Sequence, residues 1–261
     1  MKLELFSQKL PGADYYKGYF AVFEGQDGSG KSTIIASVGE ILQSKGYKVK
    51  IVPEFSSSLF GRYLLDSVSK DKFLRAQTQH PTFLTQVFAF FSDWMFLTEY
   101  EIIPALEAGM IVLKDRYTDS QVVCQIPTLL DEYNGEIGRL KQWFEEVTGI
   151  NPVIPNRVFY IDVPEEVRIT RIKNRNREFS EALADTVSGS DLRIFRERDF
   201  LYGVRMRDNK ALYTTIRNTQ SVSTSADLVV DRILRDTQDL TAKGKLRMEE
   251  SAFVSVQEGT N

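Results

Sequence analysis

The stretch "GQDGSGKS" at residues 25–32 limits the possible folds of this chain most, because it matches the whole pattern G-x-x-x-x-G-K-[ST]. A short apolar run at 18–25 predicts a strand before it, and apolar residues at helical spacing predict a helix over 31–46. In this strand–loop–helix setting, backbone N–H groups and the positive end of the helix dipole surround phosphate oxygens. We therefore expect the loop to bind the phosphates of a nucleoside triphosphate.

Individual residues of the loop have separate expected roles. We expect Lys31 to reach the β- and γ-phosphates and the Ser32 hydroxyl to bind Mg²⁺. The residues predicted to bind ATP are Gly25, Gly28, Ser29, Gly30, Lys31, Ser32 and Thr33. Asp27 occupies a position that the pattern leaves free, so it is either a turn residue or a carboxylate that faces a second substrate.

Further strands alternate with helices along the chain. We expect strands at 47–54, 110–117 and 157–164, and helices at 80–109 (broken near Pro104), 165–175 and 227–236. This alternation predicts an α/β fold in which helices cover both faces of a parallel sheet, with ligands beyond the carboxyl ends of the strands. The predicted organisation is an irregular leader at 1–17, one domain at 18–238 and a charged tail at 239–261.

Composition excludes several classes of function. The chain has 33 basic and 36 acidic residues and a net charge of −3, which argues against binding of polymeric nucleic acid. The single cysteine, Cys124, and the single histidine, His80, exclude an intrachain disulfide and a Cys/His zinc site, and they favour a cytoplasmic location. No apolar stretch approaches the about 20 residues of a membrane span, so we expect no membrane partner.

Several blocks in order resemble the thymidylate kinase family over about residues 18–235. They are "FEGQDGSGKST", "PEFSSSLFG", "FFSDW", "IIPALEAGMIVLKDRYTDS" and "RVFYIDVPEEVRITRIKNR". The resemblance implies a three-layer P-loop kinase fold with a mobile lid at about 174–190. It also implies transfer of the ATP γ-phosphoryl group to a deoxynucleoside monophosphate such as dTMP, with Mg²⁺, by a homodimer.

The strand ends carry the charges that phosphoryl transfer needs. Arg116 directly follows a predicted strand, where its guanidinium can bind a phosphate with two parallel hydrogen bonds. The resemblance assigns it the acceptor phosphate, and Asp115 beside it is expected to help hold Mg²⁺. A surface ion pair of these two residues is the alternative. Glu54 is expected to organise Mg²⁺ or the acceptor, or else to bond to loop backbone.

Three arginines lie at the end of the helix predicted over 165–175 and in the segment just after it. The resemblance places Arg175 and Arg177 in the lid as catalytic residues that reach the transferred phosphoryl group, together with Lys31 and Arg116. Arg171 lies one turn earlier without an acidic residue at helical spacing, which leaves it free to contact ATP. The alternative is a solvated basic helix face.

The predicted acceptor pocket departs from the family pattern at two positions. Phe90 aligns with the aromatic residue that stacks on the nucleobase, but Trp94 replaces an arginine that binds the base, and Cys124 replaces a tyrosine near the sugar. Ser120, Gln121 and Gln125 complete the predicted acceptor residues, which also include Asp27, Glu54 and Arg116. The preference for base and sugar therefore stays open, including dUMP or another deoxynucleotide. Trp94 can instead be a core residue.

Two other functions compete with this interpretation. A deoxynucleoside kinase would phosphorylate a 5′-hydroxyl with Glu54 as base, although the block "DRY" favours the first hypothesis. A non-catalytic nucleotide-binding protein would not need Lys31, Ser32, Asp115 and Arg116 together.

Overall fold

The computed structural model describes residues 16–70, 83–129, 135–149, 153–179, 189–242 and 246, and the structural statements below concern these residues. Five strands form one parallel sheet in the order β2-β3-β1-β4-β5. The strands are β1 (Tyr19–Glu24), β2 (Val49–Val52), β3 (Ile111–Asp115), β4 (Arg157–Asp162) and β5 (Tyr213–Arg217). The helices are α1 (Lys31–Ser44), α2 (Leu59–Lys70), α3 (Phe83–Leu97), α4 (Ile103–Glu107), α5 (Thr118–Leu129), α6 (Ile137–Thr148), α7 (Glu165–Phe179), α8 (Gly189–Asp208) and α9 (Val222–Ala242).

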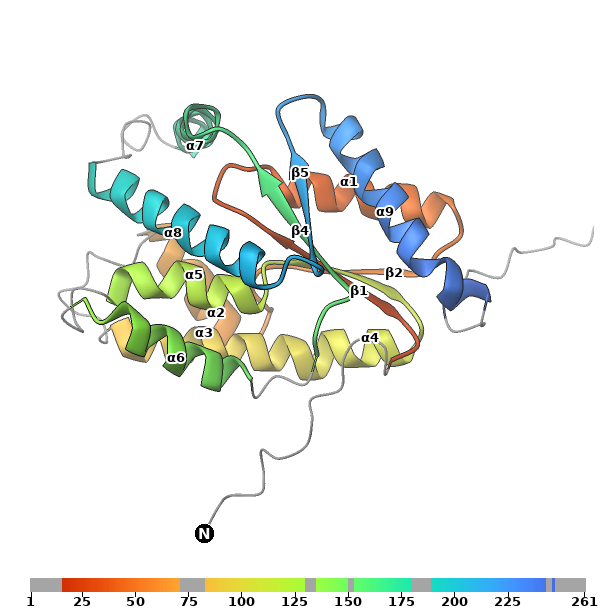
Figure 1. Ribbon diagram of the computed structural model, residues 1–261, viewed down its shortest axis with the longest axis horizontal. Helices are drawn as coiled ribbons and strands as arrows, with labels where there is room; N and C mark the ends of the chain where they lie inside the picture. The colour runs from red at the N-terminus through yellow and green to blue at the C-terminus, as the bar shows by residue number, and fades with distance from the viewer. Residues whose placement is uncertain are drawn as a thin grey trace, which may run out of the picture.

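Helices cover both faces of the sheet. Side chains of β1 alternate between two apolar clusters, so Phe20 and Val22 pack towards α3–α6 while Tyr19, Ala21 and Phe23 pack towards α1 and α9. Figure 1 shows α1 and α9 on one side of the strands and α3, α4, α5 and α6 on the other. The predicted α/β fold with a parallel sheet between two helical layers is therefore confirmed.

All four predicted strands are present, and the sequence prediction missed a fifth, β5. The last helix was predicted over 227–236, but α9 runs from Val222 to Ala242 and so continues into the segment predicted as a tail. Leu246 is buried against the cluster that α9 covers. Residues 1–15 of the predicted leader lie outside the described residues.

The long helix predicted over 80–109 changes its winding before Pro104. After α3, a π-helical turn spans Thr98–Ile102, and α4 then begins with Pro104 in its first turn. Proline is tolerated there because the first N–H groups of a helix need no intrahelical acceptor. The break therefore precedes the proline.

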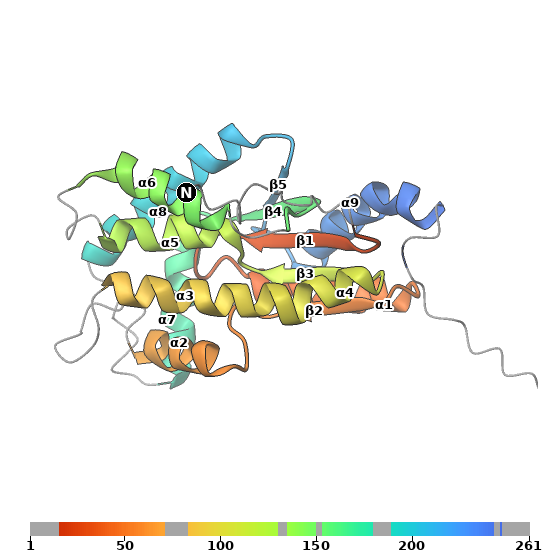
Figure 2. The ribbon, with the colours of Figure 1, turned by 90° about the horizontal axis from the view of Figure 1, so that it is seen from below.

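The fold brings the carboxyl ends of the strands to one edge of the sheet. There, the loop at 25–30 joins β1 to α1, Arg116 follows β3, and Asn218 follows β5. This is the edge at which open parallel sheets bind ligands. Figure 2 shows β1 and β3 side by side, pointing in the same direction. Among the described helices, none has the length and apolar character that a membrane span requires.

Candidate active site

The phosphate-binding loop requires its glycines. Gly25, Gly28 and Gly30 have φ values of 139°, 77° and 90°, a region that other residues rarely adopt. Space is also lacking, because a Cβ on Gly25 would lie 2.7 Å from the Ile161 carbonyl oxygen and one on Gly30 would lie 2.6 Å from the Asn218 Nδ2. The loop is thus fitted closely between the ends of β4 and β5.

Lys31 lies back over the loop. Its Nζ donates to the carbonyl oxygens of Gly25 and Gln26, both at 3.1 Å, and the side chain is buried. Burial, and then the nearby Arg116 guanidinium, lowers the pKa of Lys31. The amine is therefore poorly hydrated and lies against the loop, and its contact with the β- and γ-phosphates remains a prediction.

Ser32 and Asp115 meet at the start of α1. The Ser32 hydroxyl donates to the Asp115 Oδ2 at 2.7 Å, and the buried Asp115 Oδ1 has no hydrogen-bond partner among the described residues. A hydroxyl and a carboxylate fit Mg²⁺, which takes one or two protein oxygens and completes its shell with water and substrate phosphates. No cluster of three or more His, Cys, Asp or Glu side chains suited to a metal occurs in the described part of the chain.

Arg116 joins three elements at the centre of the site. Its Nη2 lies 2.8 Å from the Asp27 Oδ1 in the phosphate loop, and its Nε lies 3.2 Å from the Glu54 Oε1 after β2. Burial would lower the pKa of Arg116, but the carboxylates of Glu54 and Asp27 raise it, so the buried guanidinium remains charged. The alternative, a surface ion pair of Asp115 with Arg116, is wrong, because both side chains are buried and Arg116 pairs with Asp27 and Glu54 instead.

A small cavity of about 40 Å³, the acceptor cavity, opens beside Arg116. Every residue predicted to bind the acceptor lines it except Asp27, namely Glu54, Phe90, Trp94, Arg116, Ser120, Gln121, Cys124 and Gln125. A nucleobase needs several times this volume, so acceptor binding requires side chains to move. Phe55 and Phe90, whose ring centroids are 6.0 Å apart, form one wall.

Trp94 combines the two roles that the sequence left open. Its ring is 3% exposed and packs against Phe91 and Tyr117, with centroids 5.9 and 5.8 Å away, so it is a core residue. It also lines the acceptor cavity, and its buried Nε1 has no hydrogen-bond partner among the described residues. Buried donors are usually satisfied, so this N–H is a candidate contact for an acceptor.

Helix α5 supplies the other polar side chains of the cavity. The Gln121 Oε1 is buried without a hydrogen-bond partner among the described residues. Cys124 is a free thiol whose Sγ lies 3.8 Å from the Arg116 Nη1. Their roles in binding a base or a sugar remain predictions.

The predicted freedom of Arg171 is wrong. Its Nη1 donates to the carbonyl oxygens of Gly28 and Ser29, at 3.4 and 3.2 Å, and its Nη2 donates to the Asn218 carbonyl oxygen at 3.2 Å. It supports the phosphate loop from the α7 side. Arg175 and Arg177 belong to α7, but their side chains lie outside the described residues, as do residues 180–188 of the predicted lid.

Sequence reasoning missed several buried polar residues of the site. Lys114, the penultimate residue of β3, donates through Nζ to the carbonyl oxygens of Pro53, Glu54 and Asp115 at 2.6, 3.3 and 2.7 Å. Burial lowers the pKa of Lys114 to about 8. A lysine inside the apolar run "IVLKD" was the available signal.

Asp93 and Glu24 were also missed. Asp93 accepts from the Ser56 N–H at 3.0 Å and from the Ser56 hydroxyl, and so fixes the loop after β2. Glu24, which directly precedes the phosphate loop, is fully buried. A carboxylate that ends an otherwise apolar strand was the signal there.

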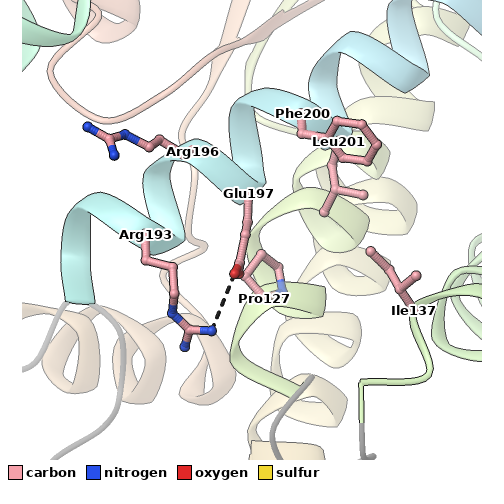
Figure 3. Close-up of a pocket in the computed structure, with 7 residues that line it drawn as sticks. All are labelled: Pro127, Ile137, Arg193, Arg196, Glu197, Phe200 and Leu201. Carbon is pink, nitrogen blue, oxygen red and sulfur yellow. Dashed lines mark hydrogen bonds and ion pairs between the residues drawn. The ribbon is translucent and has the colours of Figure 1, made fainter. Parts of the chain in front are cut away.

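A second cavity of about 380 Å³ lies between α5, the start of α6 and α8 (Figure 3). Its two arginines are already paired, Arg193 with Glu197 at 3.3 Å and Arg196 with Glu165 at 3.3 Å. None of the predicted site residues lines it. The larger cavity is thus separate from the candidate active site.

Comparison with known proteins agrees with this site. A statistical model of the family described as "Thymidylate kinase" matches residues 23–229. A protein named "Thymidylate kinase" from Thermosipho africanus is 27% identical over 224 residues, which cover 83% of this chain and 99% of that protein. Another of the same name from Leptospira borgpetersenii is 34% identical over 175 residues, covering 64% of this chain and 76% of that protein.

Proposed function

The chain belongs to the thymidylate kinase family, and on this basis we propose that it transfers the γ-phosphoryl group of ATP to dTMP, giving dTDP, with Mg²⁺. The observation that carries the proposal is the contact of Arg116 with Asp27, because it joins the acceptor cavity to the phosphate loop. A cation at this junction is what two negatively charged substrates need in order to approach each other.

The donor side of the reaction uses the loop at 25–33. Its backbone N–H groups and Lys31 hold the triphosphate, and the Ser32 hydroxyl and Asp115 carboxylate would hold Mg²⁺. When bound, Mg²⁺ neutralises charge that develops on the β- and γ-phosphates. Thr33 is exposed on the first turn of α1, where a side chain can reach the nucleotide.

The acceptor side uses Arg116 as the phosphate clamp. An oxygen of the dTMP phosphate attacks the γ-phosphorus, the bond from the γ-phosphorus to the bridging oxygen breaks, and ADP leaves. Arg116 holds the attacking phosphate, whose oxygens replace the carboxylates of Asp27 and Glu54 on the guanidinium. Arg175 and Arg177 stabilise the transferred group as the segment at about 174–190 closes, and closure excludes water as a competing acceptor.

Trp94 and Cys124 are the two proposed base and sugar contacts that depart from the family pattern. Phe90 stacks on the base, the Trp94 Nε1 donates to a base carbonyl, and the amides of Gln121 and Gln125 bond to the remaining base edge. Cys124, near Arg116, faces the sugar. These contacts favour a base with a carbonyl acceptor, as in dTMP and dUMP.

A coupled ADP-release assay tests the proposal. It compares dTMP, dUMP, the other nucleoside monophosphates and thymidine at saturating Mg·ATP. We expect the highest kcat/KM with dTMP. Turnover of thymidine without turnover of dTMP would replace the proposal with a deoxynucleoside kinase, and no turnover with any acceptor would leave a nucleotide-binding protein.

A homodimer is part of the proposal. Large apolar side chains are exposed on α2 and α3, two helices that pack against each other: Leu59, Phe60, Leu65 and Phe88. Burial of these side chains against a second copy of the chain would remove them from water. Sedimentation equilibrium should give a dimer that Leu59→Glu dissociates and that the control Leu228→Glu, on exposed α9 surface, leaves intact.

The remaining partners are small nucleotides, and we propose a cytoplasmic location, which the free thiol of Cys124 supports. Fractionation of cells that express the full chain tests the location. Recovery of the protein in an oxidising compartment would contradict it.

A further inference from the structure

The mechanism above makes no use of Glu24, the most completely buried carboxylate of the site. It is the last residue of β1 and is 0% exposed. Its Oε1 accepts from the backbone N–H groups of Tyr117 and Ser120 at 2.8 and 3.3 Å. Its Oε2 accepts from the hydroxyls of Ser120 and Tyr202 at 2.6 and 2.9 Å. Four donors from the β3–α5 connection and α8 thus converge on one carboxylate.

These bonds surround the backbone of Arg116. Arg116 has a φ of 57°, in the left-handed region that disfavours residues other than glycine, and it is the one described non-glycine residue with a positive φ. The N–H groups that Glu24 binds lie just after this strained residue. Glu24 therefore holds the turn in the conformation that aims the guanidinium at the phosphate loop.

Glu24 also fixes the guanidinium itself, through two hydroxyls. A hydroxyl has one hydrogen, so Ser120 and Tyr202, which donate to Glu24, present their lone pairs to other groups. The Arg116 Nη1 donates to these two oxygens, at 3.3 and 3.4 Å. The Glu24 carboxylate thus sets the direction of the two hydroxyl hydrogen bonds at Nη1, which lie beside the contact of Nη1 with the Cys124 thiol.

The other edge of the guanidinium has a different environment. Its Nη2 and Nε meet the carboxylates of Asp27 and Glu54, which are partly exposed, at 22% and 43%. Glu24, in contrast, contacts Arg116 indirectly. It accepts from hydroxyls that bind the guanidinium, and it does not itself accept from a guanidinium N–H. One edge is therefore anchored by neutral acceptors, and the other can receive a phosphate.

We propose that Glu24 and Tyr202 are positioning residues for Arg116, which they orient so that its Nη2–Nε edge presents to the acceptor phosphate. The proposal rests on the role that the proposed function gives to Arg116. Neither residue touches the substrate, and their effect should be specific to the phosphate of the acceptor.

Two variants test the proposal. Tyr202→Phe removes one hydroxyl with almost no change of volume. Glu24→Gln replaces the carboxylate by an amide, whose NH₂ makes the neighbouring hydroxyls accept and turns their hydrogens towards Arg116. The control is Tyr19→Phe, because Tyr19 is a buried tyrosine at the opposite end of β1 whose hydroxyl donates to the Asp236 carboxylate at 2.8 Å.

The readout compares binding of dTMP, thymidine and ATP by calorimetry, together with KM and kcat for each substrate. We expect Glu24→Gln to weaken dTMP binding about 10-fold and Tyr202→Phe about 3-fold, with thymidine and ATP changed less than about 2-fold. Tyr19→Phe should change none of them. Equal losses for dTMP and thymidine, or normal dTMP binding in both folded variants, would overturn the proposal.

The wild-type protein separates this proposal from the proposed function. If wild type prefers another monophosphate, that nucleotide and its nucleoside become the probes, and the same contrast is expected. If wild type binds and phosphorylates no monophosphate, both proposals are overturned. If wild type turns over normally but both variants bind the monophosphate as tightly as wild type does, the positioning role alone is overturned.

Discussion

Replacement of Lys114 by methionine should change the dependence of stability on pH. Lys114 is 2% exposed, and burial lowers its pKa from 10.5 to about 8. Because the folded state binds this proton more weakly than the unfolded state, the unfolded state carries more protons between pH 8 and pH 10.5. The contribution of Lys114 to the free energy of unfolding therefore rises with pH across this window.

The magnitude follows from the two pKa values. A difference of about 2.5 at 1.36 kcal/mol for each pH unit corresponds to about 3 kcal/mol in total. Most of this falls between pH 7 and pH 10. Above about pH 10 the buried Tyr19, Tyr160 and Tyr202 act in the opposite direction, because burial raises their pKa values and they resist ionisation in the folded state.

Urea unfolding at pH 7, 8, 9 and 10 measures the effect. Lys114→Met loses three hydrogen bonds to carbonyl oxygens as well as a titratable amine. Its stability relative to wild type at a single pH therefore reflects both losses. The difference in free energy of unfolding between the two proteins should nevertheless shift by about 2 to 3 kcal/mol in favour of wild type from pH 7 to pH 10. Lys45→Met, at an exposed position, is the control. Parallel pH profiles of wild type and Lys114→Met would refute the reasoning.

Three further substitutions test the site. Lys31→Ala should lower kcat by about 100-fold or more while circular dichroism and the melting temperature stay close to wild type, and near-normal turnover would contradict the role of the loop lysine. Gly30→Ala should destabilise the protein by about 2 kcal/mol or more in urea titrations, because its φ is 90° and the new Cβ would meet Asn218; an unchanged midpoint would count against the loop conformation. Trp94→Phe should raise the KM for dTMP about 3- to 10-fold with little loss of stability, since it removes an unpartnered indole N–H; an unchanged KM would show that Trp94 serves the core alone.

Much of the fold could be predicted because its signals are local. Four strands are apolar runs that end in glycine, charge or proline, and β1 is buried along its whole length. The strand β5 was missed because Ile216 is its one fully buried residue, while Thr215 and Arg217 are exposed. Its sequence therefore lacks the continuous apolar run of a central strand.

The contacts of the site were harder to predict than its members. Glu54, Trp94 and Arg116 could be placed at the cavity because they follow strands or share a helix with Phe90. The partners of Arg171 are backbone carbonyls of Gly28 and Ser29, more than 140 residues away, and of Asn218, 47 residues away, which side-chain spacing along a helix cannot show. Tyr202 lies on α8, a helix that was not predicted from the sequence. The buried face of α8 combines apolar residues with Arg198, so its sequence lacks a clear apolar stripe.

The two carboxylates on Arg116 have a kinetic consequence. On the proposed mechanism, acceptor binding would replace ion pairs that already exist, at 2.8 and 3.2 Å, so the net affinity would be the difference between two similar interactions. After the transfer, Asp27 and Glu54 can return to the guanidinium as the diphosphate departs, which lowers the barrier to dissociation. On this mechanism, the acceptor would bind less tightly, but the diphosphate would be released faster. Product release is a step that limits turnover in many enzymes.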